Sequence, residues 1–233
     1  FVDESEPLGT AGSLKFLENK FIEPFFVTNC DILVQGDYSK IYDFHLQGSF
    51  DVTLEVTDAL GNTMSQTFPN FISVIGNPGY TPPIYEGFEN ISSLPSNDWT
   101  ILNSEGPGFD VVTTGSASGS QSVKLDNSQG QNGSIDELIS NTIDLSNSGA
   151  ASISFKYAFA KRNSGNTDYL QILASKDCGE TWFMRKNISS SIIGTMANTN
   201  SNFTPTASDW KTIIIGPGSF TNYLVSDFRF KFK

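Results

Sequence analysis

The sequence predicts an all-β protein. Apolar and polar residues alternate with a period of two over several stretches, as in strands with one buried face. The 233 residues include 19 Phe, and Ser, Thr and Asn are frequent, a composition typical of β-sandwiches. No stretch keeps the 3.6-residue apolar period of an amphipathic helix for three turns. We therefore expect strands and turns without a substantial helix.

The clearest strands are marked by this alternation at residues 50–56, 153–159, 170–174 and 228–232. In the last of these, three Phe alternate with Arg229 and Lys231, so we expect one apolar face and one face in contact with water. Turn signals rich in Gly, Asn and Pro separate the strands, at residues 61–62, 77–79 and 216–218.

A Pro- and Gly-containing stretch, residues 77–83, predicts a linker between two modules. The first module would span residues 1–76 and the second residues 84–233. Charge is distributed unevenly: residues 1–79 carry 11 acidic and 3 basic residues, whereas residues 80–233 carry 14 acidic and 11 basic residues. This asymmetry supports two units.

The net charge of −11 disfavours nucleic acid as a partner, because an acidic surface repels phosphates. It suits either simple solubility or cation binding. No run of about 18 apolar residues predicts a membrane span. Both ends of the sequence suggest a piece cut from a longer chain.

Residues 48–62, GSFDVTLEVTDALGN, form a strand and a turn, and a second strand ends at residues 71–75. This stretch resembles the last hairpin of a PKD domain, with Phe50 where that family usually has Tyr. The resemblance implies an immunoglobulin-like sandwich over residues 1–76 that serves as a spacer or interaction unit.

The second module contains a series of motifs in a recognisable order. These are YEGFEN at 85–90, IDELISNTIDLS at 135–146, ISFKYAFA at 153–160 and DYLQILAS at 168–175. The order resembles the jelly-roll modules of the MAM and cleaved-adhesin type. It also resembles the region after the catalytic domain of secreted pappalysin-like (cytophagalysin) metalloproteases of Bacteroidetes. That family pattern continues with one more strand, so we expect the closing strand to be missing here.

The combined resemblance implies a secreted or cell-surface, non-catalytic accessory segment, attached to a metalloprotease, that spaces, docks or binds substrate. We expect a monomer with a protein or glycan ligand. Two alternatives remain open: a surface adhesin without an enzyme, and a carbohydrate-binding module. The aromatic candidates for the carbohydrate platform are Trp99, Tyr157, Trp182 and Trp210.

Calcium is the candidate ligand for the acidic residues of the second module, because it takes six to eight oxygen ligands. The resemblance implies a structural calcium near the first strand, with Glu89 as the matching ligand. Asp126, Asn127 and Asp136 are further candidates. The alternative is that these are ordinary surface side chains.

Residues 175–182, SKDCGETW, fit the Asp-box pattern S-x-D-x-G-x-T-W. Its members here are Ser175, Asp177, Gly179, Thr181 and Trp182. The carboxylate would cap backbone donors of a tight hairpin, Gly179 would allow a positive φ, and Trp182 would anchor the next strand in the core. A single copy predicts a structural turn rather than a catalytic site.

The sequence offers no catalytic constellation. His45 is the sole histidine, so a zinc protease site of the H-E-x-x-H type is disfavoured and no zinc is expected. A Ser–His–Asp triad would have to use the same histidine, and the sequence has no G-x-S-x-G elbow to go with it. The two cysteines, Cys30 and Cys178, lie in different predicted modules and do not form a disulfide scaffold. We expect that this chain is not an enzyme.

Overall fold

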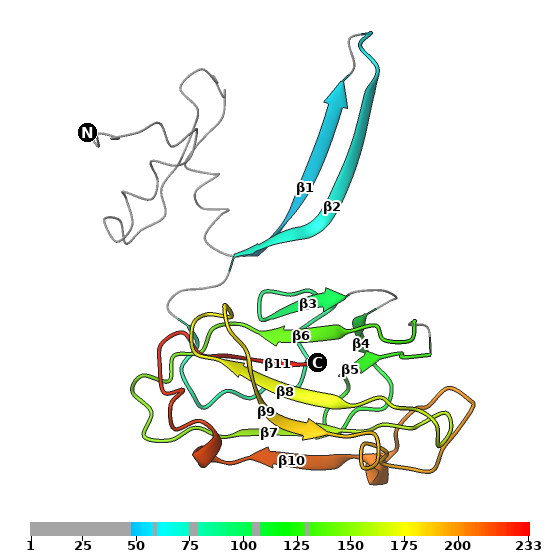
Figure 1. Ribbon diagram of the computed structural model, residues 1–233, viewed down its shortest axis with the longest axis vertical. Coiled ribbons are helices and arrows are strands. Elements are labelled where there is room, and N and C mark those ends of the chain that lie inside the picture. The colour runs from blue at the N-terminus through cyan, green and yellow to red at the C-terminus, as the bar shows by residue number, and fades with distance from the viewer. Residues whose placement is uncertain (1–47, 58–59, 75–78, 104–107, 129–130) are drawn as a thin grey trace. The chain divides into compact units, whose positions relative to one another are not determined.

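The computed structural model of the chain describes residues 48–57, 60–74, 79–103, 108–128 and 131–233 (Figure 1). Strands dominate this part of the chain, and its helical elements are two short 3-10 turns, η2 (Ala207–Asp209) and η3 (Pro217–Ser219). The predicted all-β class is confirmed, and the sheets are consistent with a β-sandwich. The immunoglobulin-like and jelly-roll assignments stay predictions, as do the module boundaries. No helix in these ranges is both long and apolar enough to cross a membrane.

Strands β1 (Gly48–Thr57) and β2 (Thr63–Val74) form an antiparallel hairpin, with an irregularity between Phe50 and Val52. Thr53 and Thr67 share a cross-strand hydroxyl hydrogen bond of 2.8 Å. Gly61, in the turn, has a φ of +84°, which glycine adopts without a steric penalty. The predicted hairpin is therefore present. Leu54 and Val56, two of its alternating apolar residues, are 57% and 59% exposed.

The main sheet has five strands in the order β3-β6-β11-β8-β9, all antiparallel to their neighbours. Figure 1 shows them as successive arrows. Their bounds are β3 (Trp99–Asn103), β6 (Asp136–Ser140), β8 (Leu170–Ser175), β9 (Phe183–Ile188) and β11 (Arg229–Phe232). The last strand of the sequence thus occupies the centre of the sheet, paired with β6 on one side and β8 on the other.

Two separate strand pairs cover the inner face of this sheet: β4 (Phe109–Val112) with β5 (Ser122–Leu125), and β7 (Ile153–Tyr157) with β10 (Lys211–Ile215). Phe109, Val111 and Val123 of the first pair pack against a cluster of Ile91, Trp99 and Leu138. The second pair packs against a larger cluster that includes Ile172, Phe220 and Phe228. Phe230 and Phe232 of β11 contact both clusters. The sandwich therefore has one continuous layer and one layer divided into two parts.

Part of the predicted linker is attached to the sandwich. The backbone of Tyr80 donates to Thr142 O at 2.9 Å and accepts from Asp144 N at 2.8 Å. Its phenol donates to Asp98 Oδ1 at 2.6 Å, and this bond, more than burial, raises the pKa of Tyr80. Gly79 lies so close to Thr142 that a Cβ would be 2.8 Å from the Thr142 backbone. The chain is therefore held on the sandwich from residue 79 onward.

Candidate ligand-binding cleft and the Asp-box turn

An open cleft of about 1190 Å³ lies where the second layer is divided. All five residues of β7 line it, and β5 contributes Ser122, Val123 and Leu125. Core aromatic side chains, including Trp99, Phe230 and Phe232, line it as well. The cleft is thus bounded by strands of both parts of the divided layer and has a largely apolar lining.

One edge of β7 is paired with β10, and no described strand pairs with its other edge. In an antiparallel pair, alternate residues direct their N–H and C=O groups away from the partner, so this edge presents unpaired main-chain groups. Trp210, which precedes β10, also lines the cleft, and its indole Nε1 is buried without a hydrogen-bond partner among the residues that are described. A buried donor without an acceptor costs free energy. The cleft therefore offers hydrogen-bonding groups as well as apolar surface.

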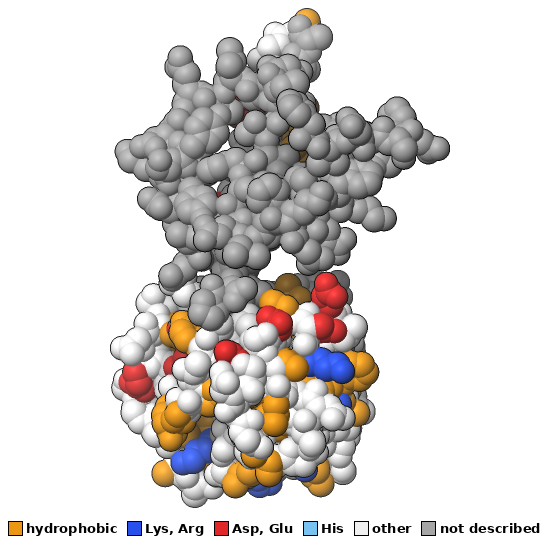
Figure 2. All heavy atoms as spheres, turned by 90° about the vertical axis from the view of Figure 1, so that its left-hand side faces the viewer, with side chains coloured by type: hydrophobic (Ala, Val, Ile, Leu, Met, Phe, Trp, Pro, Cys, Tyr) orange, Lys and Arg blue, Asp and Glu red, His pale blue; other side chains and the backbone are white. Residues whose placement is uncertain are grey.

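Exposed tyrosines contribute to the lining of the same cleft. Tyr80 and Tyr169 are each 50% exposed, and Tyr85 is 91% exposed. On the face drawn in Figure 2, apolar side chains lie among polar and charged ones. Aromatic rings of this kind are suited to contact apolar or sugar surfaces.

The four aromatic residues predicted as a carbohydrate platform are buried or partly buried. Trp99 is buried, 7% exposed, between the layers and contacts Phe88, Phe230 and Phe232. Tyr157 packs against the larger core cluster, and burial raises its pKa. Trp182 and Trp210 are both partly buried. The prediction of these residues as exposed rings is wrong for Trp99, because β3 directs its side chain into the core.

Glu86 has a structural role that the sequence analysis did not predict. Its Oε2 accepts the Trp99 indole hydrogen at 3.2 Å, and its Oε1 accepts Phe88 N at 2.5 Å. Phe88 has a φ of +62°, unusual for a residue with a side chain. Glu86 therefore holds both a core tryptophan and a strained turn in place. A buried indole N–H needs an acceptor, so a carboxylate near Trp99 in the sequence could have been predicted as its partner.

Glu89, the predicted calcium ligand, is surrounded by hydrogen-bond donors. Ser120 N and Gln121 N donate to its Oε1 at 2.9 and 3.1 Å, and Ser120 Oγ donates to its Oε2 at 2.6 Å. These bonds, led by the Ser120 hydroxyl, lower the pKa of Glu89. A carboxylate whose lone pairs are used by N–H and O–H groups has few left for a cation. Its contacts are those of a carboxylate that joins two loops, more than those of a metal ligand.

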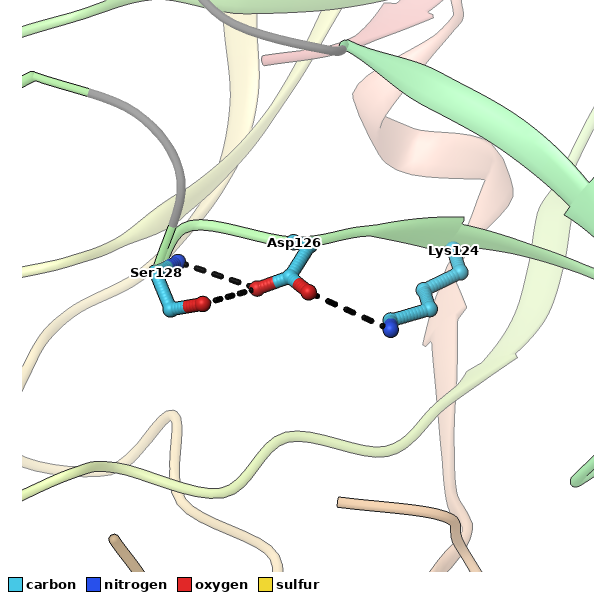
Figure 3. Close-up of polar contacts among 3 residues, drawn as sticks. All are labelled: Lys124, Asp126 and Ser128. Atoms are coloured by element: carbon cyan, nitrogen blue, oxygen red, sulfur yellow. Dashed lines mark hydrogen bonds and ion pairs between the residues drawn. The ribbon is translucent and has the colours of Figure 1, made fainter. Parts of the chain in front are cut away.

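Asp126 and Asn127 follow β5. Ser128 donates to Asp126 Oδ1 from its hydroxyl at 2.6 Å and from its N–H at 3.1 Å, and Lys124 Nζ donates to Oδ2 at 3.3 Å (Figure 3). These contacts, the Ser128 hydroxyl first, lower the pKa of Asp126. Asn127 donates to Asp168 Oδ1 at 3.3 Å. A lysine beside Asp126 competes with any cation for the same carboxylate.

Asp136, at the start of β6, is the predicted ligand with an unused oxygen. Its Oδ1 is buried without a hydrogen-bond partner in the described part of the chain, and burial raises its pKa. Within the same ranges, no three His, Cys, Asp or Glu side chains form a group that could hold a metal ion. Glu89, Asp126 and Asp136 are therefore not brought together as a ligand set, and calcium stays a prediction.

The Asp-box residues form the turn between β8 and β9. Asp177 Oδ1 accepts from Ser175 Oγ at 2.6 Å and from Thr181 N at 2.9 Å, while its Oδ2 accepts from the Thr181 hydroxyl. Ser175 Oγ in turn accepts from Gly179 N at 2.8 Å. The Ser175 and Thr181 hydroxyls are the main reason why the pKa of Asp177 is lowered to about 2. The carboxylate caps the turn, as its position in the motif predicts.

Trp182 does not anchor the hydrophobic core. Its ring lies over Lys231 Nζ, 4.5 Å from the ring centroid. Lys231, only 8% exposed, forms a 2.7 Å ion pair with Glu137 of β6. The prediction that Trp182 anchors the core is therefore wrong, because the ring covers Lys231 on the outer face of β11. Such a cation–π contact cannot be predicted from the alternation of apolar residues.

Arg229 is buried on β11 too, 7% exposed, and burial lowers its pKa. Its Nε donates to Ser140 O at 2.9 Å and its Nη1 to Cys178 O at 3.3 Å. The predicted water-facing side of β11 is therefore wrong for Arg229 and Lys231, because the Asp-box turn and β6 cover them. Cys178 carries a free thiol. His45 and Cys30 lie outside the described residues.

Comparison with known proteins gives short similarities only. The chain is 43% identical over 60 residues to a mannose-1-phosphate guanyltransferase of Aspergillus fumigatus, which is 24% of this chain and 16% of that protein. It is 38% identical over 58 residues to a probable mannose-1-phosphate guanylyltransferase 3 of Oryza sativa subsp. japonica, 23% of this chain and 16% of that protein. The chain thus spans about a sixth of the length of these curated relatives. No protein-family profile matches it, and no solved structure matches it.

Proposed function

We propose that this chain is a non-catalytic interaction segment of a secreted multidomain protein. The resemblance to pappalysin-like proteins implies that this longer protein is a metalloprotease. The chain binds a protein ligand in the cleft between β5 and β7. The observation that supports this is the combination of an apolar lining with an unpaired edge of β7. Strand edges and apolar grooves are the usual receptors for extended peptides.

A peptide-display selection against the full chain tests the proposal. Selected peptides should share apolar residues at alternate positions, because a bound strand directs every second side chain inward. The double variant Tyr85→Ala, Tyr169→Ala should lower their affinity about tenfold, since each ring contributes contact area at the cleft. Phe183→Ala is the matched control, because Phe183 is 49% exposed and lies outside the cleft lining. Equal losses in both variants would contradict the proposal.

A carbohydrate-binding module remains the second candidate, now with different residues. Tyr80, Tyr85 and Tyr169 are the exposed aromatic residues at the cleft. A glycan array probed with the full chain and with the double tyrosine variant separates the two candidates. Retention on a glycan that is lost in that variant supports sugar binding, and no retention on any glycan removes it.

The comparisons favour one further candidate, a part in guanylyl transfer to mannose 1-phosphate, the reaction in the names of the relatives. Because the match covers about a sixth of those proteins, this candidate concerns binding by a segment. Equilibrium dialysis of the full chain with GTP and with mannose 1-phosphate tests it. Saturable binding of either compound supports the candidate, and none at millimolar concentration eliminates it.

A further inference from the structure

We propose that the ligand of the cleft is an extended, acidic polypeptide segment that inserts between β5 and β7 and pairs with both strands. The proposal rests on the proposed function, because it names the ligand of the same cleft. It adds two properties: hydrogen bonds along both edges of the bound segment, and a carboxylate on its outer face. The bound segment would join the two parts of the divided layer into one sheet.

The pairing is inferred from two strand edges that border one cleft. In the described ranges β5 pairs only with β4, and β7 pairs only with β10, so each has a second edge without a partner strand (Figure 1). Both strands line the cleft. An unpaired strand edge presents N–H and C=O groups that another main chain satisfies in register. One segment between β5 and β7 would satisfy both edges, as a central strand of a sheet does.

The inner face of the bound segment would be apolar. Val123 of β5 packs against the smaller core cluster, Phe155 of β7 packs against the larger one, and both line the cleft. Phe230 and Phe232, which contact both clusters, line it as well. Alternate side chains of a strand point to the same face. Apolar residues at every second position of the segment would therefore cover this lining.

The carboxylates of the lining do not compete with an acidic ligand for its partners. Among the described residues that line the cleft, the acidic side chains are Glu86 and Asp98. Glu86 accepts a hydrogen bond from the indole of Trp99 at 3.2 Å. Asp98 accepts one from the phenol of Tyr80 at 2.6 Å. Both carboxylates are therefore engaged within the sandwich.

The lysines of the lining favour a negative charge on the ligand. Lys156 and Lys233 line the cleft, and neither ammonium group forms an ion pair within the described ranges. Lys156 is exposed between two partly buried neighbours on β7, so its side chain points to the outer face. On β5, the exposed Lys124 is already paired with Asp126 at 3.3 Å. A carboxylate of the bound segment would therefore pair across strands with Lys156.

Three synthetic peptides, measured by fluorescence anisotropy with the full chain, test the charge. Each has nine residues, with Val at every second position, Thr at the others, and Glu, Gln or Lys at the centre. We expect the Glu peptide to bind about fivefold more tightly than the Lys peptide, with the Gln peptide between them. The difference should shrink at high salt, because the pair is exposed.

A charge reversal on the chain identifies the residue that sets this preference. Lys156→Glu should make the Lys peptide bind more tightly than the Glu peptide. Lys186→Glu is the matched control: Lys186 is exposed on β9, lies outside the cleft lining, and its substitution changes the net charge equally. Both lysines are exposed, so circular dichroism should show an intact fold in both variants.

Methylation of one peptide nitrogen at a time tests the pairing. A segment paired along both edges uses every N–H group, whereas a segment added to β7 alone uses every second one. We expect the Glu peptide to lose about fivefold or more in affinity at consecutive central positions.

The possible failures are distinguishable. Equal affinities of the three peptides, or equal effects of the two lysine variants, overturn the proposal. Losses at every second nitrogen only also overturn it, in favour of a strand added to β7, and leave the proposed function intact. If no peptide of the series binds, the proposal is overturned, and peptides from the display selection then decide the proposed function separately.

Discussion

The two faces of strand β11 are covered by different interactions: Phe230 and Phe232 are partly buried on one face, and Arg229 and Lys231 are buried on the other. On the inner face, Phe230 and Phe232 pack with Trp99 and Phe155 in edge-to-face and tilted contacts. On the outer face, Lys231 is paired with Glu137 and covered by Trp182. Apolar packing tolerates small shifts of its partners, whereas a buried charge needs a partner at hydrogen-bond distance. The stability of the inner face therefore depends on how well side-chain volume fills the core. The stability of the outer face depends on the distance and orientation of the charged groups.

The largest effect should come from the inner face. Phe228, 3% exposed, immediately precedes β11 and packs against Phe220 and Tyr223. Phe228→Ala should lower the free energy of unfolding by about 4 kcal/mol, the sum of lost burial and the cavity left behind. Urea denaturation followed by fluorescence measures this. A loss below about 1 kcal/mol would mean that the surrounding side chains collapse into the space.

Breaking the ion pair should cost slightly less. Glu137→Leu leaves the Lys231 ammonium buried without its carboxylate, which should cost about 3 kcal/mol. The double variant Glu137→Leu, Lys231→Met removes both charges and should recover most of that loss. Denaturation of the parent and both variants measures this recovery and supplies three of the four species of a double-mutant cycle. If the double variant is no better than the single one, the outer face depends on the pair itself and not on the avoidance of an unpaired charge.

Gly179 links the Asp-box turn to the outer face. Its φ is +99°, and a Cβ there would lie 3.1 Å from Arg229 Nη1 and 3.2 Å from Trp182 Cζ2. Gly179→Ala should therefore cost about 2 kcal/mol, mostly as backbone strain. Gly133→Ala is the control, since that glycine has a φ of +87° with no heavy atom near the added Cβ. Equal costs at both positions would assign the whole effect to φ and none to contact with the outer face.

The smallest effect concerns pH. The pKa of Asp177 is lowered to about 2 by the Ser175 and Thr181 hydroxyls, against about 3.9 in an unfolded chain. The carboxylate therefore stabilises the fold fully above pH of about 4, and this contribution disappears as the pH falls through about 2. Asp177→Asn should be less stable than the parent at neutral pH and equal to it at the acid end. A difference in melting temperature that is constant with pH would contradict this.

The sequence predicted the class of fold and the strands with strong alternation, because a period of two is a local property. It also predicted the Asp-box turn, in which Ser175, Asp177 and Thr181 are neighbours in the chain. It did not predict that Arg229 and Lys231 would be buried, since their cover comes from residues about 50 to 90 positions away. The cleft was not predicted either: an unpaired edge of β7 is a property of strand pairing, which alternation within β7 does not encode.

The central position of β11 has a consequence for the order of folding. Strands β6 and β8 pair with β11 and not with each other, so without residues 229–232 the five-stranded sheet would separate into β3–β6 and β8–β9. The contact between Glu137 and Lys231 spans 94 residues, and such distant contacts carry a large loop-closure entropy. During synthesis, the two strand pairs cannot join before residues 229–232 have been made. We therefore expect slow completion of the sheet, with its inner face exposed to chaperones until β11 is in place.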